Sequence, residues 1–113
     1  MKIGVSSQNF RTITGHAGKA RRFFVFEKLA DGSIKELERI DLPKEMSMHE
    51  FSGDGHPVFA LDVLITAGCG DGFMRRLASH NVQVIPTAET DPTVAVETFL
   101  SGKPLSPPAP HEH

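Results

Sequence analysis

The chain has 113 residues, the size of one ordinary domain with a single core. Hydrophobic residues make up 39% and charged residues 23%, which excludes a disordered or fibrous protein. With a net charge of -2 and no apolar run long enough to cross a bilayer, the sequence predicts no nucleic-acid binding and no membrane insertion. The single cysteine excludes an intrachain disulfide, and a start without a cleavage site indicates a soluble cytoplasmic protein.

The first part of the chain is typical of an antiparallel meander. Residues 2–6 predict a strand, and residues 22–29, which carry three phenylalanines, predict a second and buried one. Asp31 and Gly32 favour a two-residue hairpin turn, so residues 33–42 are predicted to return as a third strand. The apolar residues of this third segment are spaced three apart, which also fits a helix.

The second part is typical of a βαβα unit. Pro43 breaks the pattern, and the glycine-bearing crossover that follows leaves room only for a short helix near residues 45–51. Further on we expect, in order, a strand covered on both faces at 61–67, a helix from Asp71 to about His80, a strand at 82–86 and a helix from Pro92 to Gly102, capped by Asp91.

Domain organisation follows from these elements. Residues 1–103 are predicted to form one α/β domain, and the proline-rich residues 104–113 a disordered tail. If the first and fourth strands are parallel neighbours, the mixed five-stranded sheet has the order 3-2-1-4-5, with a topological switch at the carboxyl ends of those two strands. Ligands of open α/β sheets bind at such a switch point.

Two glycine-bearing loops leave that edge of the predicted sheet. The first, after residue 6, contains the stretch TGHAG, and the second, at residues 68–72, is GCGDG. We therefore expect His16 and Cys69 at the same edge.

His16 has an imidazole nitrogen to offer to iron, and Gly15 and Gly18 leave space beside it for a bulky cluster. The thiolate of Cys69 is the ligand that iron-sulfur clusters prefer, and with Gly70 it stands at the amino end of a predicted helix. The helix dipole and nearby arginines are expected to lower the pKa of this thiol. The alternatives are a solvated loop histidine and a small cysteine in a tight turn.

Further histidines give weaker candidates. His49 and His56 come from the glycine-bearing crossover, where a mobile loop could bring either to a metal, although surface histidines usually have no such role. His111 and His113, in the predicted tail, are expected to be inert.

Several stretches of this sequence carry a family resemblance. They are KIGVSS, then GHAGKARRFFVFE, which is similar to a GHFGxAxxF pattern, and finally DVLITAGCGDGFMRRL and VQVIPTAETDPTVAVETFLSG. Over residues 1–103 the chain resembles the dinitrogenase iron-molybdenum cofactor biosynthesis family. The resemblance implies a ribonuclease H-like three-layer fold with helices on both faces of the sheet. It also implies binding of an iron-sulfur or iron-molybdenum cluster. The family commonly has another residue where Cys69 stands, so a ligand role of Cys69 rests on its chemistry alone.

The leading hypothesis is a non-enzymatic carrier that holds a cluster transiently through His16, with Cys69 as a second ligand. Its expected partners are nitrogenase or cofactor-assembly proteins, and its expected state is a monomer or weak homodimer. One alternative is a thiol-dependent hydrolase of small thioesters or phosphate esters, with Cys69 as nucleophile and His16 as base. Another is an interaction module that has lost the cluster.

Overall fold

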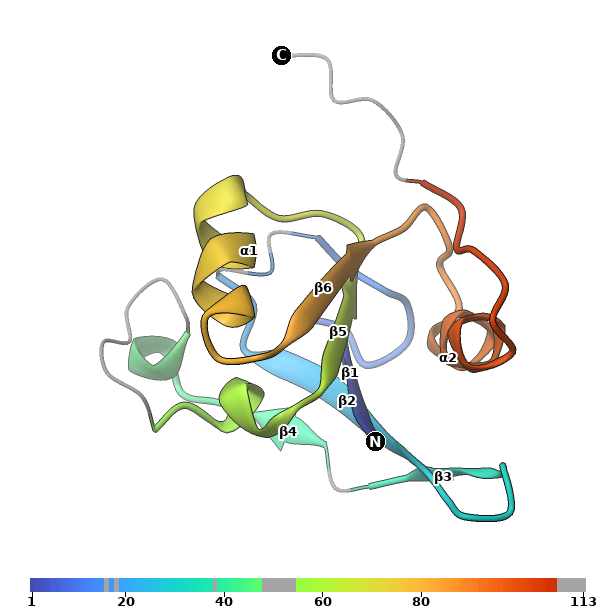
Figure 1. Ribbon diagram of the computed structural model, residues 1–113. Coiled ribbons are helices and arrows are strands. Elements are labelled where there is room, and N and C mark those ends of the chain that lie inside the picture. The colour runs from blue at the N-terminus through green and yellow to red at the C-terminus, as the bar shows by residue number, and fades with distance from the viewer. Residues whose placement is uncertain (16, 18, 38, 48–54, 108–113) are drawn as a thin grey trace.

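The computed structural model describes residues 1–15, 17, 19–37, 39–47 and 55–107. Within this part the chain forms one six-stranded mixed sheet and two α-helices (Figure 1). The strands are β1 (Lys2–Ser6), β2 (Arg22–Lys28), β3 (Ile34–Glu36), β4 (Ile40–Asp41), β5 (Val63–Thr66) and β6 (Gln83–Pro86). The helices are α1 (Asp71–Ala78) and α2 (Pro92–Leu100).

The strands are ordered β3-β2-β1-β5-β6, with β4 also paired to β2. β1 is antiparallel to β2, where Val5 lies opposite Phe24, and parallel to β5, where Val5 lies opposite Ile65. β6 continues the sheet in parallel with β5. The prediction that the first strand and the strand near residues 61–67 are parallel neighbours is therefore confirmed.

The return from β2 differs from the prediction in two ways. The amide of Leu29 donates to the carbonyl of Ser33, so the hairpin loop has three residues and ends in Gly32 at a φ of 88°, instead of a two-residue turn. The third predicted strand is two short strands, β3 and β4, which pair with opposite halves of β2. The helical alternative for this segment is wrong, and the sheet has six strands instead of five.

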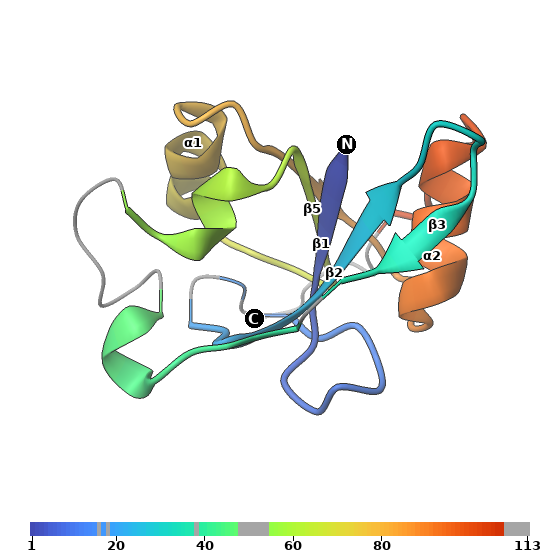
Figure 2. The same ribbon diagram turned by 90° about the horizontal axis from the view of Figure 1, so that it is seen from below.

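The two helices cover opposite faces of the sheet, so the protein has three layers (Figure 2). Alternating side chains of each strand point to the two faces. On the α2 side, the core contains Ile3, Val5, Phe24, Phe26, Val63, Ile65, Ala95 and Val96. On the α1 side, it contains Ala20, Phe23, Val25, Val58, Leu61, Leu64, Leu77 and Val82. All four residues of β5 are buried, as expected for a strand covered on both faces.

The crossover between β4 and β5 carries two short 3-10 turns, η1 (Lys44–Met46) and η2 (Pro57–Ala60). η1 overlaps the start of the short helix predicted near residues 45–51, Ser47 forms a bend, and residues 48–51 lie outside the described residues. η2 was not predicted from the sequence.

Part of the predicted tail, residues 104–107, belongs to the described residues and contacts the domain. Leu105 packs against the core on the α2 side, and the carbonyl of Ser106 accepts hydrogen bonds from the amide of Ala88 at 3.0 Å and the hydroxyl of Thr87 at 2.7 Å. Partial burial of Leu105 removes apolar surface from water, which favours this contact together with the two hydrogen bonds. Residues 108–113 lie outside the described residues. In the described part of the chain, no helix has the length and apolar character needed to cross a membrane.

The cap of α2 gives a direct test of this fold. Oδ1 of Asp91 accepts hydrogen bonds from the amides of Thr93 at 2.9 Å and Val94 at 3.1 Å. We expect Asp91→Ala to lower the free energy of unfolding by about 1 kcal/mol, and Asp91→Asn, which keeps the acceptor oxygen, to cost clearly less. Urea denaturation of the three proteins measures both values, and an equal loss in the two variants would contradict the capping role.

Candidate functional site

The loops that follow β1 and β5 lie against each other at the carboxyl edge of the sheet. The amide of Ala67 donates to the carbonyl of Thr14 at 3.2 Å, and the amide of Ala17 donates to the carbonyl of Gly68 at 3.2 Å. A Cβ placed on Gly15 would lie 3.6 Å from the amide nitrogen of Gly68. Gly15 and Ala17 therefore contact the turn that carries Cys69, which was the placement expected for the two loops.

Of the residues predicted for this edge, His16 and Gly18 lie outside the described residues. Their roles stay predictions. Gly15, Cys69 and Gly70 are described, and Gly70 is exposed to solvent at the start of α1.

A buried pair of hydroxyl groups ties the two loops to the strand ends. Ser6 and Thr66, the last residues of β1 and β5, are completely buried, and their hydroxyl oxygens lie 2.8 Å apart. The hydroxyl of Ser6 lies 2.6 Å from the carbonyl oxygen of Thr14, and that of Thr66 lies 3.2 Å from the carbonyl oxygen of Gly68. The sequence analysis missed this pair, although a small hydroxyl residue at the end of each of two parallel neighbours is a usable signal.

The loop after β1 has its own internal bonds. The hydroxyl of Ser7 donates to the carbonyl of Thr12 at 2.6 Å, and Oδ1 of Asn9 accepts from the amides of Arg11 and Thr12 at 2.9 Å each. Phe10, between Asn9 and Arg11 in the sequence, adopts a φ of 54°, a conformation uncommon for a residue with a bulky side chain. Such a network holds the first half of the loop in one conformation and supports the contact between Thr14 and Ala67.

The thiol of Cys69 is half-buried, and its electrostatic environment differs from the expectation. Burial raises its pKa above the ordinary value for cysteine, and the carboxylate of Asp71 raises the pKa further. The predicted lowering by the helix dipole and arginines is therefore wrong, because loss of solvent and a nearby negative charge both disfavour the thiolate. At neutral pH the thiol keeps its proton, which weakens it as a nucleophile and makes metal binding release a proton.

His56 is buried at 3% exposure, and both of its ring nitrogens face backbone groups. Nδ1 accepts a hydrogen bond from the amide of Val58 at 3.1 Å, and Nε2 lies 2.5 Å from the carbonyl oxygen of Met46. His56 is therefore the cap of η2 in this structure, with both ring nitrogens engaged by backbone groups, in contrast to the metal-ligand role that the sequence suggested for it. His49, the other crossover candidate, lies outside the described residues.

Comparison with known proteins identifies the family to which this chain belongs. Residues 1–102 match the family described as Dinitrogenase iron-molybdenum cofactor. The chain belongs to this family. No curated protein matches the chain.

Two solved structures are similar in fold to this member of the dinitrogenase iron-molybdenum cofactor family. The crystal structure of PH0822 superposes with a TM-score of 0.71 at 17% identity, covering 91% of this chain and 93% of that chain. The NMR structure of a candidate NifB protein from Thermotoga (TM1290), of the DUF35 family, gives a TM-score of 0.63 at 14% identity, covering 99% and 97%. At these identities the two likenesses establish the shared fold.

Among the described residues of this family member, no group of three or more histidine, cysteine, aspartate or glutamate side chains is placed to hold a metal ion. In that part of the chain Cys69 is a free cysteine, and it lies in the loop after β5.

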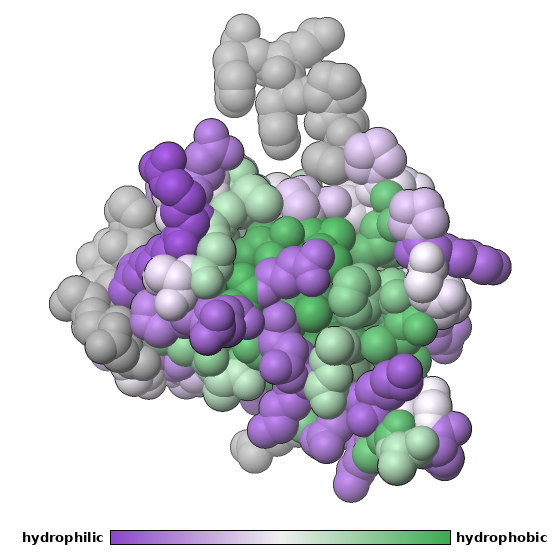
Figure 3. Space-filling model, viewed as in Figure 1, coloured by the Kyte–Doolittle hydropathy of each residue, from purple (hydrophilic) through white to green (hydrophobic). Residues whose placement is uncertain are grey.

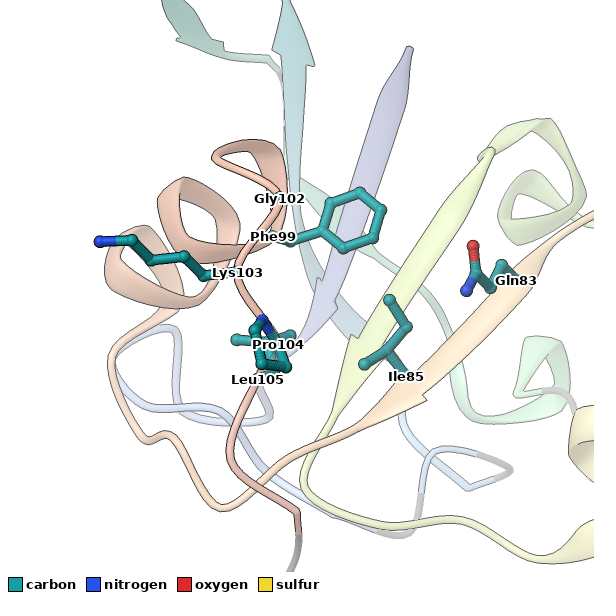
Figure 4. A pocket seen from close by; sticks show the side chains of 7 residues that line it. All are labelled: Gln83, Ile85, Phe99, Gly102, Lys103, Pro104 and Leu105. Atoms are coloured by element: carbon teal, nitrogen blue, oxygen red, sulfur yellow. The ribbon is translucent and has the colours of Figure 1, made fainter.

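A separate hollow of about 410 Å³ lies between the sheet, α2 and the segment that follows it (Figure 4). Figure 3 shows hydrophobic residues gathered over this side of the molecule around β6. Gln83, Ile85, Phe99, Gly102, Lys103, Pro104 and Leu105 line the hollow, and Figure 4 shows the Lys103 side chain pointing away from it. Most residues of this lining are apolar, which is unsuited to an anionic ligand.

The environment of Cys69 predicts a slow reaction with iodoacetamide. We expect the rate to rise with pH with an apparent pKa above that of the same thiol in the urea-unfolded chain, because burial and Asp71 disfavour the thiolate. Asp71→Asn removes the negative charge and should shift the profile toward lower pH. A folded-state profile below the unfolded one would contradict the described environment.

Proposed function

We propose that this protein is a carrier that transiently holds an iron-sulfur or iron-molybdenum cluster precursor during metallocofactor assembly. The observation that carries the proposal is the contact between the two loops, in which Ala17 bonds to Gly68 and Thr14 bonds to Ala67. These bonds bring the turn with Cys69 against the loop that contains the GHAG stretch. Membership of the dinitrogenase iron-molybdenum cofactor family supports a cluster as the cargo.

The proposed roles follow from the chemistry of each residue. The sulfur of Cys69 binds iron after losing its proton, and the imidazole of His16 supplies a nitrogen ligand. Gly15, Gly18 and Gly70 carry no side chains, so the cluster can approach the backbone closely. His49 is a further predicted ligand.

Transient custody is consistent with a small number of protein ligands, because each additional ligand slows release. The partners that receive or supply the cluster are proposed to be nitrogenase or other cofactor-assembly proteins. We also propose that the three-layer sheet is ribonuclease H-like, an assignment supported by the antiparallel β1, β2 and β3 and the parallel β1, β5 and β6.

A non-enzymatic role is part of the same proposal. A hydrolase that used Cys69 as nucleophile would need a thiolate near neutral pH, whereas burial and the Asp71 carboxylate raise the pKa of this thiol. We therefore expect no turnover of thioester or phosphate-ester probes by the purified protein. A hydrolytic rate that disappears in Cys69→Ser would favour the enzyme instead.

Anaerobic reconstitution with iron and sulfide tests the carrier proposal. We expect the wild-type protein to bind iron and sulfide stoichiometrically, His16→Ala to lose most of both, and Cys69→Ser to bind more weakly, because each variant removes a proposed ligand. Visible absorption and elemental analysis provide the measurement. His111→Ala is the matched control and should bind like the wild type. Equal binding by wild type and His16→Ala would remove His16 from the site.

A further inference from the structure

His56 joins the two 3-10 turns of the crossover. Its Nδ1 accepts from the amide of Val58 in η2, and its Nε2 lies 2.5 Å from the carbonyl oxygen of Met46 at the end of η1. An amide donor can bond only to a ring nitrogen that carries no proton, so Nδ1 is unprotonated. The ring proton is then on Nε2, where it is donated to Met46. A single neutral tautomer therefore satisfies both bonds.

A second proton on His56 would break one of these bonds. It would place an N–H at Nδ1 directly opposite the N–H of Val58, so that two donors would face each other. The positive charge would also be held on a ring that is 3% exposed. Loss of the Nδ1 acceptor leaves the start of η2 without its cap.

The groups packed around the ring include a positive charge that also favours the neutral form. The guanidinium of Arg76, from α1, opposes a positive charge on His56. His80, which follows α1, stacks on Phe59 with ring centroids 3.6 Å apart, and Phe59 contacts the His56 ring edge-on at 5.9 Å. On η1 the neighbouring Glu45 is exposed, and η2 contains no titratable residue.

We propose that His56 is a proton-sensitive clasp, which joins η1 to η2 when neutral and releases the cap of η2 when protonated. Burial, opposed by the bond to Met46 and aided by Arg76, holds its pKa below the ordinary value of 6.5. Because the folded-state pKa is lowered, the clasp contributes its full stability above pH 6.5 and loses it as pH falls through the folded-state pKa. The proposal is independent of the cluster.

The consequence is a pH-dependent connection between the crossover and the rest of the fold. η2 leads directly into β5, since the amide of Leu61 bonds to the carbonyl of Val58 and β5 begins two residues later. Phe59 of η2 also contacts the end of α1 through His80. Opening of the clasp is therefore expected to loosen η2 where it packs on α1, while the sheet stays intact.

NMR spectroscopy of the full chain between pH 7.5 and 5 tests the clasp. We expect the His56 ring nitrogens to report the Nε2–H tautomer at pH 7.5 and a titration midpoint below 6.5. As His56 titrates, the hydrogen-exchange rate of the Val58 amide should rise roughly tenfold, the size expected for loss of a cap. This rate is first corrected for the intrinsic dependence of amide exchange on pH. Unchanged protection of Val58 through the titration, or a midpoint above 6.5, would overturn the proposal.

Two variants separate His56 from its neighbours. His56→Asn keeps a side-chain acceptor for Val58 but does not titrate, so protection of the amide should become independent of pH. His80→Asn removes the imidazole ring that stacks on Phe59 and should keep the wild-type dependence on pH. The same pH dependence in His56→Asn as in wild type would assign the effect to another group. If His56→Asn does not fold, the wild-type and His80→Asn titrations still decide the question.

Discussion

Parallel pairing of β1 with β5 brings the buried hydroxyl groups of Ser6 and Thr66 within 2.8 Å of each other, and the loops that follow both strands depend on that placement. Each hydroxyl lies within hydrogen-bonding distance of a carbonyl in one of the two loops, those of Thr14 and Gly68. Because unsatisfied polar groups are costly in a core, this arrangement specifies where the chain leaves each strand. The two loops are thus built as a unit on the centre of the sheet.

The chemistry of Cys69 follows from its partial burial, which raises the pKa of the thiol. A thiol whose pKa is raised reacts more slowly with oxidants and electrophiles at neutral pH, because less of it is thiolate. A metal cluster that binds through sulfur must displace that proton, so binding is coupled to pH and to proton release. The raised pKa therefore argues against Cys69 as a nucleophile, while a soft metal can still bind its sulfur as a ligand.

Local sequence signals predicted the strands and helices well, and tertiary contacts account for what they missed. The pair Asp91 and Pro92 marks the start of α2 directly, because capping depends on neighbours in sequence. The environment of Cys69 depends on its burial in the folded chain, and the second ring contact of His56 is with Met46, ten residues away. Neither can be read from spacing. Leu105 was likewise assigned to a disordered tail, since its burial depends on the shape of the core.

Paramagnetic NMR of the reconstituted protein tests the central claim, that one cluster is held where the two loops meet. Electron spins of an iron cluster broaden nearby amide signals, so the broadening locates the cluster without any substitution. The account predicts that the signals of Gly15, Ala17, Gly68 and Cys69 broaden together, while those of Ile85 and Leu105 at the apolar hollow persist. Broadening centred on the hollow, or confined to only one of the two loops, would contradict the shared site.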